Sequence, residues 1–259
     1  MTDYPLPNAS TDLSGQVALV TGASSGLGDR FARVLAASGA EVVIAARRLD
    51  RLETLAAEIA EAGGRAYPVH LDMTDDASIL AAVDAAEEAT GKTVTILINN
   101  AGVPDAQRAH KMSTELVDSV LGINLRGPYI LSCEVARRLI AAELPGRMVN
   151  ISSSAAYNYS GSGAALYSIT KAAIARMSEV LAVEWVRYGI NVNGIAPGAF
   201  HSEMMDGMVA RMGDITSRMP RGRIADPAQM DSTLLYLCGP ASDAVTGTVI
   251  RIDDGQGPR

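Results

Sequence analysis

Short, continuously apolar runs alternate with longer helical patterns along most of this chain. A strand with one solvated face alternates apolar and polar residues, so continuous apolar runs are typical of strands covered on both faces. We expect about seven such strands, at residues 16–21, 41–45, 66–71, 94–98, 147–152, 190–195 and 249–252. Helices are expected after 28, at 49–59, 74–90, 113–126, 128–143 and 165–188, and after 226. This order predicts an α/β fold of Rossmann type, in which a doubly wound parallel sheet carries helices on both faces.

The chain of 259 residues is long enough for one large domain with a well-buried core. No internal repeat or linker divides it, so we expect a single domain over residues 13–259, preceded by a loose segment at 1–12. The first twelve residues lack the basic start and apolar run of a signal peptide, and no apolar stretch is long enough to span a bilayer. We therefore expect a cytoplasmic protein without a membrane partner.

The charged and metal-binding residue types exclude two further classes of function. The net charge is −7, and the 22 Lys and Arg residues are scattered, so nucleic acid is not expected as a partner. Cys133 and Cys238 lie far apart in apolar helical segments, which favours reduced core thiols over a disulfide. No metal site is expected, since the three histidines show no ligand spacing with either cysteine.

The segment 150–171 (NISSSAAYNYSGSGAALYSITK) combines a strand end, a Ser/Gly/Tyr loop and the start of a helix. Tyr167 and Lys171 are four residues apart, so their side chains share one helix face. A free phenol, with a pKa near ~10, is a poor acid or base at neutral pH, and a neighbouring ammonium group lowers that pKa. A serine from the preceding strand end would then hold a substrate oxygen beside the phenol. Alone, such a pair is also typical of a solvated helix surface.

A glycine loop, Gly22-Ala-Ser-Ser-Gly26-Leu-Gly28, joins the first expected strand to the first helix. Glycines let the backbone approach a pyrophosphate, and the helix N-terminus offers N–H groups and a positive dipole end. Arg47 and Arg48 stand at the end of the second strand, where a carboxylate would bind an adenosine ribose. Guanidinium groups instead pair with a 2′-phosphate, so NADP(H) is favoured. NAD(H) is the alternative, if both arginines belong to a solvated turn.

Together these motifs resemble the short-chain dehydrogenase/reductase family in its single-domain form. The resemblance covers about residues 13–255. It rests on TGASSGLG at 21–28, NNAG at 99–102, the Tyr167/Lys171 pair and the Pro-Gly pair at 197–198. It implies a single dinucleotide site at the carboxyl ends of the strands.

The resemblance also implies a role for each matched residue. Asp72 would bind the adenine amino group, NNAG would pack beside the adenosine ribose, and Ser202 would bond the nicotinamide carboxamide next to Pro197-Gly198. The expected cofactor-binding residues are Gly22, Ser24, Ser25, Gly26, Leu27, Gly28, Arg47, Arg48, Asp72, Met73, Asn99, Ala101, Gly102, Tyr167, Lys171, Pro197, Gly198, Phe200 and Ser202.

The expected catalytic residues are Asn124, Ser153, Tyr167 and Lys171, with Asn124 anchoring a proton-relay water. The family's serine usually stands 13 residues before the tyrosine, which selects Ser154, whereas counting along the strand from 146 selects Ser153. A one-residue insertion in the loop 160–164 reconciles the two counts, because loops absorb insertions and a slipped strand turns its side chains over. We therefore favour Ser153, with Ser154 lining the substrate pocket.

The segment 199–221 carries methionines at helical spacing and is either a mobile substrate lid or a helix packed on the core. As a lid it favours an apolar or bulky ketone over a sugar. The expected substrate-binding residues are Ser154, Ala155, Tyr157, His201, Met204, Met205 and Met208.

The resemblance implies a reversible, NADPH-dependent reduction of a ketone to a secondary alcohol by tyrosine acid/base catalysis. The alternatives are an NAD-dependent secondary-alcohol or hydroxysteroid-type dehydrogenase, a 3-oxoacyl thioester reductase and, more remotely, a catalytically silent nucleotide-binding protein. A sugar-nucleotide epimerase uses the same Tyr/Lys chemistry but usually adds a substrate domain, for which this chain has no room. A homotetramer or dimer is also implied, with the helices at 128–143 and 165–188 forming one interface.

Overall fold

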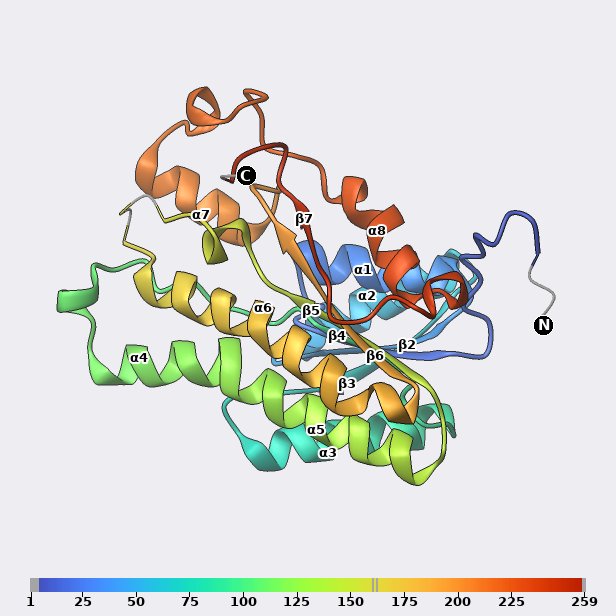
Figure 1. Cartoon of the computed structure of the whole chain (residues 1–259). Helices are drawn as coiled ribbons and strands as arrows, with labels where there is room; N and C mark the ends of the chain where they lie inside the picture. The colour runs from blue at the N-terminus through green and yellow to red at the C-terminus, as the bar shows by residue number, and fades with distance from the viewer. Residues whose placement is uncertain (1–4, 160, 162, 258–259) are drawn as a thin grey trace.

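The computed structural model describes residues 5–159, 161 and 163–257. Within them, seven strands form one sheet in the order β3-β2-β1-β4-β5-β6-β7, and each neighbouring pair is parallel (Figure 1). The strands are β1 (Val17–Thr21), β2 (Glu41–Ala46), β3 (Arg65–His70), β4 (Ile96–Asn99), β5 (Gly146–Ile151), β6 (Ile190–Pro197) and β7 (Val249–Ile252). The predicted doubly wound parallel sheet is confirmed.

The direction of winding reverses between β1 and β4, which lie side by side at the middle of the sheet. From β1 the chain builds outward through β2 to β3, and from β4 it builds the other way to β7. Loops that leave the carboxyl ends of these two strands diverge, which opens the crevice in which such sheets bind ligands. The glycine loop follows β1 and NNAG follows β4, so the topology brings both to this crevice.

Helices cover both faces because the strand side chains alternate between two cores. Ala18 and Val20 of β1 belong to the core under α1, α2 and α8, whereas Val17 and Leu19 belong to the core under α3, α5 and α6. Figure 1 shows these two sets of helices on opposite sides of the sheet. The helices are α1 (Gly26–Ala37), α2 (Leu49–Glu61), α3 (Asp76–Thr90), α4 (Thr114–Leu121), α5 (Gly127–Ala141), α6 (Ala165–Trp185), α7 (Glu203–Met212) and α8 (Asp231–Cys238).

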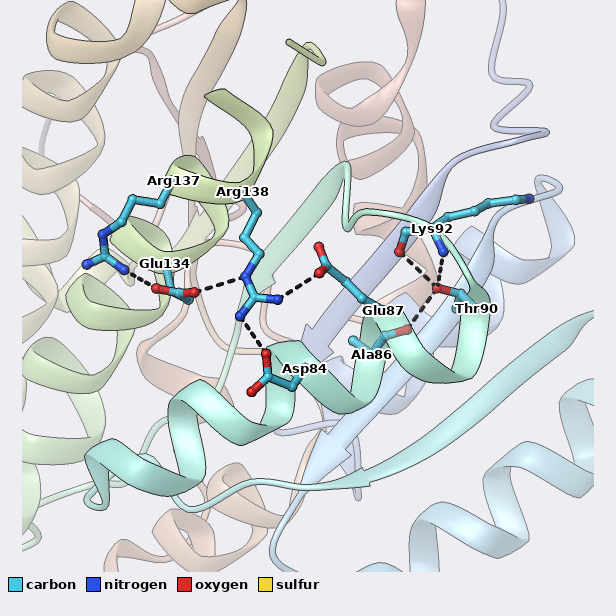
Figure 2. A network of polar contacts seen from close by, with 8 residues as sticks. All are labelled: Asp84, Ala86, Glu87, Thr90, Lys92, Glu134, Arg137 and Arg138. Atoms are coloured by element: carbon cyan, nitrogen blue, oxygen red, sulfur yellow. Dashed lines mark hydrogen bonds and ion pairs between the residues drawn. The ribbon is translucent and has the colours of Figure 1, made fainter. Parts of the chain in front are cut away.

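On the second face, α3 and α5 are joined by a network of ion pairs around Arg138 (Figure 2). Its guanidinium lies 2.6 Å from a carboxylate oxygen of Asp84 and 2.7 Å from one of Glu87, both on α3. It lies 2.9 Å from Glu134, one turn back on α5. These carboxylates raise the pKa of Arg138 above its ordinary value. The network thus joins α3 to α5, its neighbour in this layer.

Several element boundaries differ from the sequence prediction. The third strand is shifted by one residue from the predicted 66–71. The helix predicted at 113–126 is α-helical only over α4 and continues as a π-helix over Gly122–Arg126 into α5. Pro128 stands two residues after this turn and has no N–H to give the carbonyl of Asn124 the usual i+4 bond, which accounts for the irregular geometry.

Two helix ends are also irregular. The segment after α6 tightens into a 3-10 turn over Val186–Tyr188, and α8 is preceded by a 3-10 turn over Pro227–Met230 that Asp226 caps. Of the predicted loose segment 1–12, residues 1–4 lie outside the described part, and 5–12 are exposed and have no helix or strand. No helix among the described residues is long and apolar enough to cross a membrane.

Candidate active site

The first two turns of α6 carry the predicted Tyr/Lys pair. Tyr167 is partly buried, and the Nζ of Lys171 lies 5.7 Å from the centre of its ring. Lys171 is only 4% exposed, and its Nζ donates a 2.8 Å hydrogen bond to the carbonyl of Ile151 at the end of β5. The ammonium group is therefore held between the sheet edge and the phenol ring, as a solvated surface lysine would not be.

Ser153 meets the phenol from the loop that leaves β5. Its hydroxyl is hydrogen-bonded to Tyr167 and also accepts from the N–H of Ala155, which caps a 3-10 turn over Ser154–Ala156. Ser154 begins that turn and lies beyond the residue that contacts the phenol. The geometry thus brings Ser153 and Tyr167 together, in agreement with the count along the strand.

The protein surroundings shift the two titrating groups in a way that differs from the sequence expectation. Burial is the largest cause acting on Tyr167 and raises the pKa of its phenol, while the hydrogen bond with Ser153 opposes that rise. Burial lowers the pKa of Lys171 to about 8. Desolvation is thus the largest influence on the phenol, and a lowering of its pKa by Lys171 stays a prediction.

Asn124, in the π-helical turn, connects the loop after β4 to α6. Its Oδ1 accepts from the N–H of Val103 at 2.8 Å, and its Nδ2 donates to the carbonyl of the same residue at 2.9 Å. The Nδ2 also donates to the hydroxyl of Thr170 on α6 at 3.3 Å. Both polar atoms of the side chain thus bind protein groups, and a predicted water would have to be held by the backbone of this turn.

The glycine loop lies against the loop after β4 too closely for larger residues. A Cβ added to Gly28 would stand 2.3 Å from the carbonyl oxygen of Gly22 and 2.6 Å from the Nδ2 of Asn100. A Cβ on Gly22 would stand 2.8 Å from the Cα of Ala101. The N-cap of α1, Ser25, forms no capping bond with its side chain, so the first turn of α1 is left to a ligand. These residues fit the pyrophosphate of a dinucleotide.

Arg48 points back over this loop from the end of β2. Its guanidinium donates to the hydroxyl of Ser24 at 3.0 Å and to that of Ser25 at 3.0 Å. Its neighbour Arg47 is exposed. The Asp72 carboxylate accepts from the N–H and the hydroxyl of Thr74, and these two bonds lower its pKa. Arg48 is therefore the predicted basic residue that directly contacts the glycine loop.

Of the NNAG residues, the first has a buried side chain and the last lies at the crevice. Asn99 is 3% exposed, and its Nδ2 donates to Ser132 and Asn150 within the sheet and its helix layer, so its side chain is turned away from the predicted ribose. Gly102 lies at the crevice, where an added Cβ would stand 3.4 Å from the Nζ of Lys171. The amide nitrogen of Asn99 thus belongs to a buried polar cluster, and a contact between Asn99 and the ribose stays a prediction.

The segment after β6 touches the glycine loop. Ser202 caps α7 by accepting from the N–H of Met205 at 3.2 Å, and a Cβ added to Gly26 would stand 3.2 Å from its Cβ. A Cβ added to Gly198 would stand 2.6 Å from the Oε1 of Gln256, which accepts from the next backbone N–H. Phe200 is 5% exposed in the core under α1 and α8, so only its backbone is available to a cofactor.

The predicted substrate residues gather around α7 and the loop after β5. None of the α7 residues is buried, so its methionines do not form the core-packed helix that was the alternative to a lid. His201 is exposed, whereas Ser154 and Ala155 are partly buried. The ring of Tyr157 lies against the guanidinium of Arg251 on β7, 4.1 Å from its centre. Across the described residues, no group of three His, Cys, Asp or Glu side chains is placed to hold a metal ion.

Comparison with known proteins supports this geometry. The family profile described as short chain dehydrogenase matches residues 16–212. The chain belongs to the short-chain dehydrogenase/reductase family. Gluconate 5-dehydrogenase of Gluconobacter oxydans is 34% identical over 246 residues, which is 94% of this chain and 95% of that protein. As a member of this family, the chain is an NAD(P)-dependent oxidoreductase that acts on CH–OH groups.

Solved structures of short-chain dehydrogenases/reductases match the whole fold. A gluconate 5-dehydrogenase from Burkholderia cenocepacia in complex with NADP and tartrate has a TM-score of 0.88 and 30% identity, over 96% of this chain and 98% of that one. A variant of actinorhodin polyketide ketoreductase with NADPH has a TM-score of 0.89 and 32% identity, over 94% of this chain and 98% of that one.

Three residues of this short-chain dehydrogenase/reductase were missed by the sequence prediction. Asn100 donates to the carbonyls of Thr21 and Gly22 and so ties NNAG to the glycine loop. Asp105 accepts from backbone N–H groups of α6, and Glu203 forms ion pairs with Arg48. The repeated asparagine of NNAG was a usable signal for the first. The other two contacts join residues 61 or more positions apart, which no local pattern shows.

Proposed function

We propose that the protein is an NADP(H)-dependent oxidoreductase that interconverts an apolar or bulky ketone and its secondary alcohol. The observation that carries the proposal is the placement of Ser153 and Lys171 about Tyr167. A neutral hydroxyl is bonded to the phenol, and an ammonium group that is 4% exposed lies 5.7 Å from its ring. This arrangement supports general acid/base catalysis at a carbonyl or alcohol oxygen.

In this mechanism, a bound nicotinamide supplies or accepts the hydride. In the direction of reduction, Tyr167 donates its proton to the oxygen of the substrate as negative charge develops there. Ser153 donates a hydrogen bond to the same oxygen and keeps it beside the phenol. Lys171 stabilises the phenolate that remains, because a positive charge in a buried site favours a nearby anion.

Asn124 has a positioning part in this mechanism. Its side chain holds the backbone of Val103 and the hydroxyl of Thr170, so it keeps the loop after β4 against α6. The missing N–H of Pro128 leaves the carbonyl of Asn124 without its usual i+4 partner. A water bound at that carbonyl would return a proton toward Lys171.

The preference for NADP(H) is supported by the basic residues at the end of β2. Arg48 lies against both serines of the glycine loop, and a guanidinium group pairs with a phosphate monoester by two hydrogen bonds. No carboxylate follows β2 where a 2′-hydroxyl would need an acceptor, since Ala46 is followed by two arginines. The gluconate 5-dehydrogenase structure contains NADP, which agrees with this assignment.

The apolar substrate is supported by α7, whose Met204, Met205 and Met208 are not used by either core. Flexible thioethers adapt to varied apolar shapes. A polyol or sugar acid is the second candidate, and it is favoured by the likeness to gluconate 5-dehydrogenase over nearly the whole chain. The two candidate substrates differ in polarity, so α7 would cover an apolar molecule in the first case and a polar one in the second.

We also propose that the protein assembles as a homotetramer or dimer. Helix α6 exposes large apolar side chains: Val183 is 79% exposed, Ile169 63% and Val180 43%. Tyr129 of α5 is 50% exposed. Apolar surface of this kind on two long helices is typical of an interface between subunits.

The test is a fluorescence titration of the full-length protein with NADPH and with NADH, followed by turnover of an apolar ketone panel and of gluconate. We expect tighter binding of NADPH, and we expect Arg48→Ala and Arg47→Asp to weaken NADPH binding while leaving NADH binding unchanged. Equal binding of both cofactors by the wild type would contradict the NADP(H) assignment. Turnover of gluconate but of no apolar ketone would select the second candidate.

A further inference from the structure

Asp105 is a buried carboxylate that the reaction scheme above does not use. It follows β4 in the loop after NNAG and is 3% exposed. One oxygen accepts from the N–H of Leu166 at 2.8 Å and from that of Tyr167 at 3.2 Å, and the other accepts from Ala106 at 2.8 Å. Among the described residues no Lys, Arg or His forms an ion pair with it, and the hydrogen bonds that it accepts all come from backbone N–H groups.

Helix α6 depends on this carboxylate for its first turn. Its own N-cap residue, Ala164, forms no capping bond, because alanine has no acceptor. The two N–H groups that Asp105 binds are orphan donors of that turn, and one of them belongs to Tyr167 itself. A carboxylate there also interacts favourably with the positive end of the helix dipole.

The loop that presents Asp105 is fixed from two sides. Ala106 has a left-handed φ of 51°, and its N–H is held by Asp105. Two residues before Asp105, Val103 is bound through both its N–H and its carbonyl by Asn124. A Cβ added to Gly163 would stand 3.4 Å from the backbone carbon of Gln107, so this loop also packs on the residues that enter α6. The carboxylate is thus rigidly placed rather than adapting to the helix.

We propose that Asp105 is a positioning residue for the reaction, which holds Tyr167 at the start of α6 and keeps a fixed negative charge beside it. The proposal rests on the proposed function, in which Tyr167 is the acid/base. In this proposal the Asp105 side chain has two effects that can be separated. Its hydrogen bonds orient the phenol toward Ser153, and its charge disfavours the phenolate.

Lys171 lies near the ring of Tyr167, and Asp105 accepts from its backbone N–H. Lys171, on the same helix, favours the phenolate, and Asp105, from the loop after β4, disfavours it. Ser153, from the loop after β5, is uncharged and hydrogen-bonded to the phenol. Charges of both signs therefore act on the phenol, and its pKa is expected to respond to the removal of either one. Removing the negative charge lowers that pKa.

The experiment is a phenolate titration of the full-length protein by ultraviolet absorbance, alone and saturated with NADP⁺. Subtracting the matching Tyr167→Phe protein isolates one of the 8 tyrosines. We expect Asp105→Asn to lower the midpoint of Tyr167 by about half a pH unit or more, since a nearby like charge is removed. The pH profile of kcat/KM should shift in the same direction. Asp105→Ala, which also loses the hydrogen bonds, should lower kcat further without changing the KM for NADPH.

Asp226→Asn is the matched control, because Asp226 also accepts from a backbone N–H, that of Ala228, but caps a turn before α8. It should leave the midpoint of Tyr167 unchanged. An unchanged or raised midpoint in Asp105→Asn, or an equal shift in Asp226→Asn, would overturn the proposal. If Asp105→Ala does not fold, Asp105→Asn and Asp105→Glu still decide it. Full turnover in Tyr167→Phe would instead reject the proposed function, which is a separate result.

Discussion

Two helices begin at the carboxyl edge of the sheet beside the site, and their first turns are stabilised in opposite ways. At α1 the N-cap Ser25 forms no capping bond, glycines clear the backbone, and Arg48 lies over the loop. At α6 the N-cap Ala164 has no side-chain acceptor, but Asp105 reaches across from the loop after β4 and binds two N–H groups. One first turn is left for an anion from outside, and the other is filled by an anion of the chain.

The difference follows from what each helix must hold. Helix α1 is expected to present backbone N–H groups to a phosphate, and the carboxylate in its first turn, Asp29, is paired with Arg33. Helix α6 presents two side chains, and a buried acceptor with charge-assisted bonds, each about 1.5–3 kcal/mol, keeps their backbone in place without the cofactor. We therefore expect substitutions at α6 to impair the chemical step and substitutions at α1 to impair cofactor binding.

The largest effect is expected at the phenol of α6. Tyr167→Phe removes the acid/base but keeps the ring that packs over Lys171, so turnover should fall by about a thousandfold. NADPH affinity should change little, because the glycine loop is untouched. Steady-state kinetics and fluorescence titration measure the two quantities. A variant that loses cofactor binding as well as turnover would show that the two helices do not have separate tasks.

A second prediction concerns the buried lysine of α6. Its pKa is about 8 in the folded protein and 10.5 as the ordinary value, so the unfolded chain binds more protons between these two pH values. Burial of Lys171 therefore costs stability below pH 8, and this cost is relieved as pH rises toward 10.5. Lys171→Met removes the cost, which is at most about 3 kcal/mol for such a shift.

The measurement is urea unfolding of both proteins without cofactor from pH 7 to 10. The free energy of unfolding of the variant relative to the wild type should fall with rising pH by up to that amount. Cys238, whose pKa burial raises to about 12, acts with the opposite sign but is present in both proteins and cancels. If the difference in the free energy of unfolding between the two proteins is constant with pH, burial of the charged Lys171 does not destabilise the folded protein.

A third prediction sharpens the α1 side of the comparison. In Gly28→Ala the new Cβ would stand 2.3 Å from the carbonyl oxygen of Gly22, so the loop must move away from the phosphate position. The Kd for NADPH should rise by about a hundredfold, equivalent to roughly 2.7 kcal/mol. Gly207→Ala is the control, because a Cβ there meets no atom within 4 Å. Weak binding in both variants would point to a general effect on folding.

The fold was predictable because its signals are local. Apolar runs indicated all seven strands and the sheet type, because the five inner strands β1, β2, β4, β5 and β6 are buried over almost their whole length. The π-helical turn at Gly122–Arg126 was not predicted, although Pro128 removes a donor there. The apolar pattern of this segment continues that of α4 and α5, so periodicity alone predicts two successive regular helices there.

The parts of the site that were not predictable depend on long-range contacts. Asp105 meets Leu166 across 61 residues, and no spacing in the sequence relates them. Asn99 matches its motif but turns into a buried cluster with Ser132 and Asn150, because its position on β4 points that way. The shift of the Tyr167 pKa depends on desolvation, which a sequence does not contain. Residue identity therefore predicts the groups present, and packing decides what each one contacts.

The smallest effect is expected where a carboxylate of the chain does approach the α1 side. Glu203, the first residue of α7, forms ion pairs with Arg48 and Arg51, and its side chain is 52% exposed. A 2′-phosphate bound by Arg48 would compete with this carboxylate. Exposed ion pairs contribute less than about 1 kcal/mol, so Glu203→Gln should lower the Kd for NADPH by only about threefold and leave that for NADH unchanged.

Glu58→Gln removes an equally exposed charge that pairs with Arg33, and it controls for net charge in the same titration. A gain for NADPH in both variants would be a general electrostatic effect. A gain for both cofactors in Glu203→Gln alone would mean that α7 limits access to the whole crevice rather than to the phosphate. A gain for NADPH alone would mean that the start of α7 and the 2′-phosphate share one basic site. Cofactor binding would then loosen α7, the helix proposed to cover the substrate, and this would couple the cofactor side of the crevice to the substrate side.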